Sequence, residues 1–139
     1  MTRRVVLDTN VWLDWLVFRD PAVETIRDAV ASGLAELWID EACVAELARV
    51  LAYPLGRFTL DAEGQAKALA EALALARRWD DSARDAKLPL CRDPDDQKFL
   101  ALVAACGAQV LVTKDLELLR LAKRVPFRIL TPAAFASVG

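Results

Sequence analysis

Histidine is absent from the 139 residues of the chain, and this absence excludes a large group of hydrolytic mechanisms. Ser/His/Asp and Cys/His arrangements both need an imidazole as the general base. A zinc site is disfavoured as well, because the chain also has no Cys-x-x-Cys pair to supply sulfur ligands. The chemistry that remains is that of carboxylates, lysine and hard divalent cations.

Long apolar runs and a strong charge bias are also missing. The sequence has no stretch of about 18 apolar residues, which is the length that would predict a membrane-spanning helix. Arg3 and Arg4 are followed by only three apolar residues before Asp8, which is not a signal-peptide pattern. The net charge is −2, so nucleic acid would have to bind a local patch rather than a generally basic surface.

Cysteine is scarce and odd in number. The three residues, Cys43, Cys91 and Cys106, are far apart and lie in apolar surroundings. Such a pattern is typical of reduced, buried thiols in a reducing compartment. We therefore expect a cytoplasmic protein with no membrane partner.

What is present is an alternation of short apolar strands with amphipathic helices, in a length that suits a single domain over residues 1–139. The expected strands are nearly continuous apolar runs at residues 5–7, 34–39, 110–112 and 127–130. The expected helices cover residues 11–17, 21–33, 40–53, 61–79, 93–107 and 116–122, with a small one after Pro132. The charged segment 80–89 fits either a short strand or a loop. This order predicts an α/β fold with a mostly parallel sheet of 4–5 strands, covered on both faces.

Acidic residues recur where these strands end. Asp8 and Asp115 follow the strands at 5–7 and 110–112, and Asp96 lies in the first turn of the helix at 93–107. Glu46 lies in the second turn of the helix at 40–53, beside its apolar stripe, which is an unfavourable place for a lone carboxylate. Because ligands of parallel sheets bind outside the carboxyl ends of the strands, we expect the four acids to converge there.

Four converging carboxylates would repel one another and raise one another's pKa values. A hard cation such as Mg²⁺ or Mn²⁺ removes that penalty, and it can also activate water and offset the charge of a phosphodiester. The pattern therefore predicts a metal-dependent hydrolase of phosphodiester bonds, a reaction that needs no histidine.

Each acid also has a structural interpretation. Asp8 and Asp115 each precede a helix and would serve as N-caps, while Glu46 would be an ordinary surface glutamate. Among the acids of the Asp93-Pro94-Asp95-Asp96 segment, at least one is expected to cap the helix, and the pattern does not say which. Asn10 or Thr9 is expected to cap the first helix.

Basic and aromatic residues near the acids have two interpretations each. Arg92, Lys98 and Lys114 are candidate contacts to a nucleic-acid backbone, although solvated surface positions are the simpler explanation. Trp12 and Trp15 have the spacing of packing residues, with base stacking as the alternative. The Ala- and Leu-rich helix at 61–79 is explained mainly by core packing, with a homodimer face as the alternative.

Four segments together resemble the PIN domain family, and more narrowly the PIN-family toxins of bacterial toxin–antitoxin systems. They are VVLDTNV at 5–11, Glu46-Leu47, DPDDQKFL at 93–100 and VTKD at 112–115, and the resemblance extends over nearly the whole chain. It implies a three-layer αβα sandwich, a Mg²⁺ or Mn²⁺ site, endoribonuclease activity on RNA and a cognate antitoxin protein as partner.

By this resemblance, the metal-binding and catalytic acids are Asp8, Glu46, Asp96 and Asp115. Thr9 and Asn10 match the polar residues that support the first acid, and Thr113 is a further support. The chain departs from the family pattern at Lys114, where glycine is common, and at Glu117, where a further aspartate is common. Neither change removes one of the four acids.

Three other functions are weighed against the toxin. A housekeeping PIN nuclease would carry the same acids. A non-catalytic PIN-like module binding nucleic acid or protein is disfavoured by the complete acid set. A phosphoacceptor receiver domain needs its Thr and Lys on two separate strands, whereas Thr113 and Lys114 are adjacent here.

Overall fold

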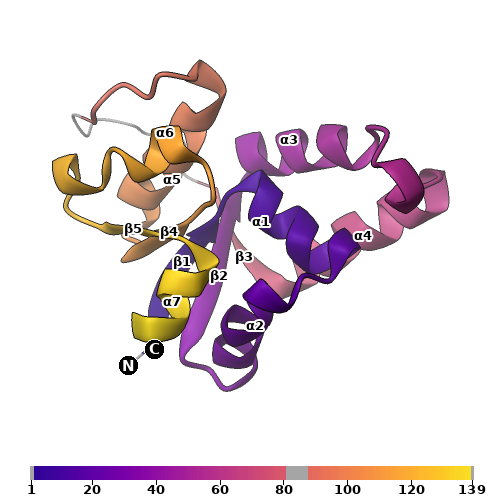
Figure 1. The fold of residues 1–139 in the computed structure, drawn as a ribbon, viewed down its shortest axis with the longest axis horizontal. Helices are drawn as coiled ribbons and strands as arrows, with labels where there is room; N and C mark the ends of the chain where they lie inside the picture. Colours follow the sequence, from indigo (N-terminus) through magenta and orange to yellow (C-terminus); the bar gives the residue numbers. More distant parts are fainter. Residues whose placement is uncertain (1, 81–87, 139) are drawn as a thin grey trace.

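A parallel β-sheet of five strands forms the centre of the computed structural model, which describes residues 2–80 and 88–138 (Figure 1). The strands are β1 (Arg3–Leu7), β2 (Ala35–Asp40), β3 (Ala76–Trp79), β4 (Val110–Val112) and β5 (Arg128–Leu130). Their order across the sheet is β3-β2-β1-β4-β5, and every neighbouring pair is parallel. The predicted α/β class is thus confirmed, and all carboxyl ends of the strands lie along one edge.

Helices connect these strands. The α-helices are α1 (Thr9–Leu13), α2 (Glu24–Ala31), α3 (Glu41–Leu51), α4 (Ala62–Leu75), α5 (Gln97–Cys106), α6 (Leu116–Leu119) and α7 (Pro132–Val138). The shorter turns are the π-helix η1 (Asp14–Phe18) and the 3-10 helices η2 (Pro21–Val23), η3 (Gly56–Phe58), η4 (Pro94–Asp96) and η5 (Ala122–Arg124). In the described part of the chain, no helix combines the length and apolar character that crossing a membrane requires.

The strand order places the helices in two layers. From β1 the chain steps to β2 and then to β3, whereas β4 and β5 lie on the other side of β1. Because parallel crossovers are right-handed, connections that run in opposite directions cover opposite faces of the sheet. Accordingly, α2 and α7 pack together on one side, while α5 packs on β1, β2 and β4 on the other (Figure 1).

Buried apolar side chains fill the space between these layers. The central strands β1 and β4 are buried along most of their length, as near-continuous apolar runs require in a sheet covered on both faces. Trp12 and Trp15 are almost fully buried, with ring centroids 6.1 Å apart, so they are packing residues. Cys43, Cys91 and Cys106 are buried and free, as the sequence predicts.

The prediction of a helix continuing to about Trp79 is wrong. α4 ends at Leu75, and Ala76–Trp79 form the edge strand β3, which pairs with β2 from Leu37 to Asp40. The Trp79 ring packs edge-on against Trp38 at 5.9 Å, and Arg77 lies 3.2 Å from Glu36. These contacts with β2 override the helix-forming preference of the segment. Of the uncertain segment 80–89, residues 81–87 lie outside the described residues.

Of the capping residues that the sequence offers for the first helix, the structure selects Asp8. Asp8, and not Thr9 or Asn10, is the N-cap of α1: its Oδ1 accepts a hydrogen bond of 2.9 Å from the Val11 backbone N–H. The predicted helix at 11–17 changes at Asp14 into the π-helix η1, which ends at Arg19 in the left-handed conformation, with φ of 52°. Asp8 therefore has a structural role that any functional role must accommodate.

Candidate functional site

An acidic cleft of about 240 Å³ lies at the carboxyl ends of β1 and β4. The chain leaves β1 toward one side of the sheet, and β4 lies on the other, so this is the switch point where ligands of such sheets bind. The polar lining residues are Asp8, Thr9, Asn10, Glu46, Arg49, Tyr53, Asp93, Asp95, Asp96 and Asp115. All four acids predicted from the sequence therefore line one cleft.

Asp8 is the buried acid of this cleft, with 4% of its surface exposed. While its Oδ1 caps α1, its Oδ2 accepts a hydrogen bond from the Thr113 hydroxyl at the end of β4. Burial raises the pKa of Asp8, and the charge of Asp115 adds to the increase, whereas the hydrogen bonds from Thr113 and Val11 and the charge of Lys114 oppose it. The ionised carboxylate is thus fixed in orientation but short of positive charge.

Asp115 and Asp96 face each other next to Asp8. Asp115 is the N-cap of α6, since its Oδ1 accepts a 2.9 Å hydrogen bond from the Glu117 backbone N–H. The capping interpretation is therefore correct for Asp115, but it uses only one of the two carboxylate oxygens.

Asp96 has no such structural role. Its side chain makes no capping hydrogen bond to α5, because Asp93 caps the preceding turn η4 instead. Asp96 Oδ2 is buried and has no hydrogen-bond partner among the described residues. Burial raises the pKa of Asp96 to about 8, with further contributions from a hydrogen bond to Asp115 and from the negative charges of Asp115, Asp93 and Asp8. When Asp96 is ionised, its negative charge is therefore not balanced by a nearby positive charge of the described residues.

Glu46 lies on the other wall of the cleft, on α3. The hydroxyl of Thr9 donates to its Oε1, and the Lys98 ammonium donates to its Oε2 at 2.6 Å. Arg49, one turn further along α3, lies 3.7 Å from the same Oε2. The Glu46 side chain is only 12% exposed, so the interpretation as an ordinary surface glutamate is wrong.

The predicted basic residues occupy different environments. Lys98 is engaged with Glu46, and Lys114 forms a 2.5 Å ion pair with Asp14 of η1. Arg92 is exposed and is not among the residues that line the cleft, so its contact with substrate stays a prediction. The solvated-surface interpretation therefore fits Arg92 best of the three.

Three residues of this region were not singled out from the sequence. Arg49 follows Glu46 at i+3 on α3, a spacing that was available as a signal, and Tyr53 lines the cleft from just beyond the end of α3 at Leu51. Asp14 is 5% exposed within an otherwise apolar segment, and a charge at such a position indicates a partner elsewhere in the chain.

The donor set of the cleft fits a hard divalent cation. Its lining combines carboxylates, hydroxyls and one guanidinium, with no sulfur or imidazole, and oxygen ligands are those that Mg²⁺ prefers. Asp96 Oδ2 has a free lone pair in a buried position. Among the described residues, however, no three acids are already grouped closely enough to surround one ion. The acids would therefore have to rotate their side chains toward a bound ion.

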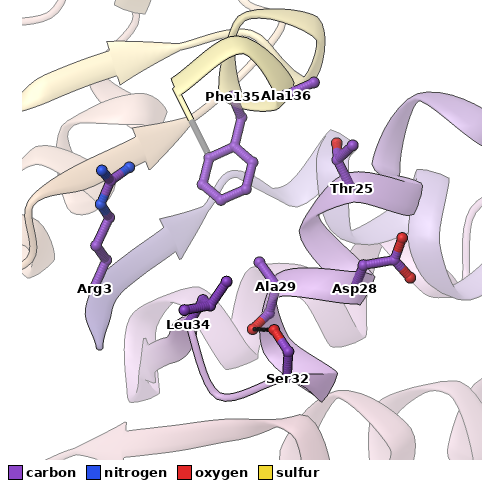
Figure 2. Close-up of a pocket in the computed structure, with 8 residues that line it drawn as sticks. All are labelled: Arg3, Thr25, Asp28, Ala29, Ser32, Leu34, Phe135 and Ala136. Carbon is purple, nitrogen blue, oxygen red and sulfur yellow. Dashed lines mark hydrogen bonds between the residues drawn. The ribbon is translucent and has the colours of Figure 1, made fainter. Parts of the chain in front are cut away.

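A second, larger cavity of about 410 Å³ lies at the opposite edge of the sheet (Figure 2). It is bounded by the beginnings of β1 and β2, by α2 and by α7, and the ring of Phe135 points into it toward Ala29 and Leu34. Its lining is mostly apolar and contains one acid, Asp28, and one base, Arg3. The acidic cleft is the smaller of the two, but it is the better candidate for a functional site because it gathers several carboxylates.

The fold and the cleft define a class of protein: a parallel α/β domain with carboxylates gathered at its switch point. The chain belongs to the PIN domain family, whose family model matches residues 4–117. PIN domains are nucleases, and they generally use divalent metal ions.

One solved structure that matches is the VapBC2 complex from Rickettsia felis, bound to a DNA fragment from its promoter. The similarity has a TM-score of 0.63 with 18% sequence identity, and it covers 91% of this chain and 96% of the matched chain. At this identity the match establishes the fold. No curated protein matches the chain.

Proposed function

We propose that the chain is a metal-dependent endoribonuclease and acts as the toxin of a type II toxin–antitoxin system. The observation that carries the nuclease proposal is the meeting of Asp8, Asp96 and Asp115 at the switch point, where Asp96 Oδ2 is buried without a partner. Buried carboxylates of this kind are costly unless a cation compensates them. Family membership supplies the reaction class, and the cleft supplies the residues.

In this proposal, Asp8, Glu46, Asp96 and Asp115 hold Mg²⁺ or Mn²⁺. When bound, such an ion lowers the pKa of water and offsets negative charge on a phosphodiester. Thr113 and Thr9 act as supports, because their hydroxyls donate to Asp8 and Glu46 and fix the orientation of both carboxylates. Asn10 is exposed at the cleft, where its amide is available to substrate.

RNA is proposed to enter along α3. Arg49 is 55% exposed at the cleft, and a guanidinium there suits a phosphate of the RNA backbone. Tyr53 is 47% exposed and lines the same cleft just beyond the end of α3, where its ring offers a stacking surface for an unpaired base. Lys114, 46% exposed although paired with Asp14, is a further candidate phosphate contact. The overall charge is close to balanced, so this local set has to supply the attraction.

The toxin role is proposed from the fold match to a structure whose title names a VapBC2 complex. By analogy, the partner of this chain would be a cognate antitoxin protein, and the location would be the cytoplasm. A housekeeping PIN nuclease is the second candidate, because the same acids would serve it equally.

Cleavage of a panel of structured RNAs tests the nuclease proposal. We expect the purified protein to cleave with Mg²⁺ or Mn²⁺ and to stop in EDTA, and we expect Asp8→Asn and Asp96→Asn each to abolish cleavage while remaining folded. Asp28→Asn is the matched control, since this exposed acid on α2 lines the opposite cavity. Cleavage that persists in EDTA, or in nuclease-free Asp8→Asn protein, would refute the mechanism.

Induced expression in a bacterial host separates the toxin from the housekeeping enzyme. A toxin should arrest growth, Asp8→Asn should not, and the product of a small neighbouring gene with a DNA-binding motif should bind the chain and restore growth. An active nuclease that leaves growth unchanged would favour the housekeeping candidate.

A further inference from the structure

Lys98 does not itself line the cleft, but its ammonium contacts two residues that do, Glu46 and Asp95. Lys98 is the second residue of α5, and a cation in the first turn of a helix opposes the helix dipole. Its side chain nevertheless reaches across to α3, where Nζ donates to Glu46 Oε2 at 2.6 Å, and it also donates to the backbone carbonyl of Asp95. The contact with Glu46 joins residues that are 52 positions apart in the chain.

The pair differs from an ordinary surface ion pair in its burial. The side chain of Lys98 is 20% exposed and that of Glu46 is 12% exposed. Exposed lysine–carboxylate pairs contribute little because water and salt screen them, whereas partly buried pairs are screened less. Ordering a lysine side chain also costs rotamer entropy, which the contacts of the ammonium have to offset. The Lys98 ammonium is therefore held in one position, between Glu46 Oε2 and the backbone carbonyl oxygen of Asp95.

Both oxygens of Glu46 are engaged within the protein. Oε1 accepts from Thr9, and Oε2 accepts from Lys98. The acids on the other side of the cleft differ, because Asp96 Oδ2 has no partner and no lysine or arginine contact to Asp96 or Asp115 is found among the described residues. Positive charge is thus already supplied at Glu46 and is lacking at Asp96 and Asp115.

We propose that the Lys98 ammonium is the resident second cation of this cleft, so that the protein binds one divalent ion, at Asp8, Asp96 and Asp115, rather than two. Lys98 is then a positioning residue: it holds Glu46 and supplies, beside the bound ion, the positive charge that a second ion supplies in two-metal nucleases. This inference rests on the proposed metal-dependent function and changes one part of it. Glu46, which was proposed above as one of four acids that hold the ion, binds the Lys98 ammonium instead, and the other three acids hold the ion.

Mn²⁺ binding to the metal-free protein tests the proposal without relying on activity. By isothermal titration calorimetry and by electron paramagnetic resonance of free Mn²⁺, we expect one ion per chain for the natural sequence. Lys98→Met, which keeps the length of the side chain and removes its charge, should bind two. Lys98→Arg keeps the positive charge and should bind one Mn²⁺ ion per chain. The double variant Lys98→Met/Glu46→Gln should also bind one, because the second ion needs the Glu46 carboxylate. Lys123→Met, at an exposed lysine of η5, is the control for the loss of a positive charge.

The activity of the same variants gives an independent readout. For RNA cleavage, the Hill coefficient for Mn²⁺ should rise from about 1 in the natural protein to about 2 in Lys98→Met, as a second ion replaces the ammonium. Circular dichroism and thermal melts establish that each variant is folded, and Lys98→Arg provides a test if Lys98→Met is not.

The outcomes distinguish this inference from the proposed function. Two ions bound by the natural protein, or one ion bound by both the natural protein and folded Lys98→Met, would overturn the role of Lys98 and leave the nuclease proposal standing. Mn²⁺ bound by neither protein would overturn both. If Lys98→Met does not fold, a Lys98→Arg variant that binds two ions would overturn the inference, and one that binds a single ion would support it.

Discussion

Substitution of Asp8 separates the two roles that the structure gives to this carboxylate. Asp8→Asn retains an oxygen to accept from the Val11 backbone N–H, but it removes the negative charge. Asp8→Ala removes the charge and the hydrogen bonds with Val11 and Thr113 together. In Asp8→Asn the amide N–H can donate to the Thr113 hydroxyl, which reverses the direction of the natural hydrogen bond. Because both variants are neutral, the difference in stability between them reports the hydrogen bonds and packing of this side chain without its charge, at every pH.

The magnitude follows from these contacts. Loss of an N-cap costs about 1 kcal/mol, and leaving the buried Thr113 hydroxyl without its partner costs about 1 kcal/mol more. With about 2.1 cal/mol/K of unfolding entropy per residue, a chain of 139 residues loses roughly 3.4 °C of melting temperature per kcal/mol. Asp8→Ala should therefore melt about 7 °C below Asp8→Asn.

The effect of the Asp8 charge on stability is measured by comparing the natural protein with Asp8→Asn in EDTA, without bound metal. Burial raises the pKa of Asp8 above the ordinary value of 3.8, so the unfolded chain loses this proton at a lower pH than the folded protein does. The contribution of Asp8 to stability is then largest below pH 3.8 and falls as the pH rises from there through the folded-state pKa. Relative to Asp8→Asn, the natural protein should therefore lose stability as the pH rises above about 4.

Thermal melts followed by circular dichroism measure both effects. Mn²⁺ at one hundred times its dissociation constant should raise the free energy of unfolding of the natural protein by about 2.7 kcal/mol. Its melting temperature should rise accordingly, and that of Asp8→Asn should rise much less. Equal melting temperatures for the Asn and Ala variants would refute the capping argument. A pH-independent difference between the natural protein and Asp8→Asn would refute the argument from the buried charge.

Two further predictions concern the other charges of the site. Since the pKa of Asp96 is about 8, most molecules carry this proton at pH 7, and binding of Mn²⁺ should release it; calorimetry in two buffers of different ionisation enthalpy should show the release in the natural protein and much less of it in Asp96→Asn. Lys114→Met should destabilise the protein by roughly 1 kcal/mol in urea unfolding, because it leaves the buried Asp14 unpaired while the half-exposed Lys114 limits the loss. The double variant Asp14→Asn/Lys114→Met should recover part of that loss, and a Lys114→Met protein as stable as the natural one would show that the ion pair contributes nothing.

The sequence by itself determined the α/β class and the edge of the sheet at which the acids gather. Apolar runs such as Val110–Val112, buried on both faces, are readable because a parallel sheet leaves no polar face on its central strands. Asp8 and Asp115 follow directly from the ends of β1 and β4, since parallel strands all end along one edge. The motif DPDDQKFL at 93–100 carried the family resemblance, which the family match confirms.

Only the tertiary structure decided the conformation of one segment and the roles of similar acidic side chains. Ala76–Trp79 is a strand only because β2 lies beside it with Trp38 and Glu36 in reach. Asp93 caps a helical turn and Asp96 does not, although both stand in the same acidic segment.

The long-range hydrogen bonds and ion pairs at the cleft could not be predicted from local sequence patterns either. Thr113 and Asp8 are separated by 105 residues, and Lys98 and Glu46 by 52. Periodicity and capping rules describe neighbours within a few residues, whereas the charge balance of a site depends on which distant side chains the folded sheet brings together. The position of each acid could therefore be predicted, but the lysine that neutralises Glu46 and the absence of one at Asp96, within the part of the chain that the structure describes, could not.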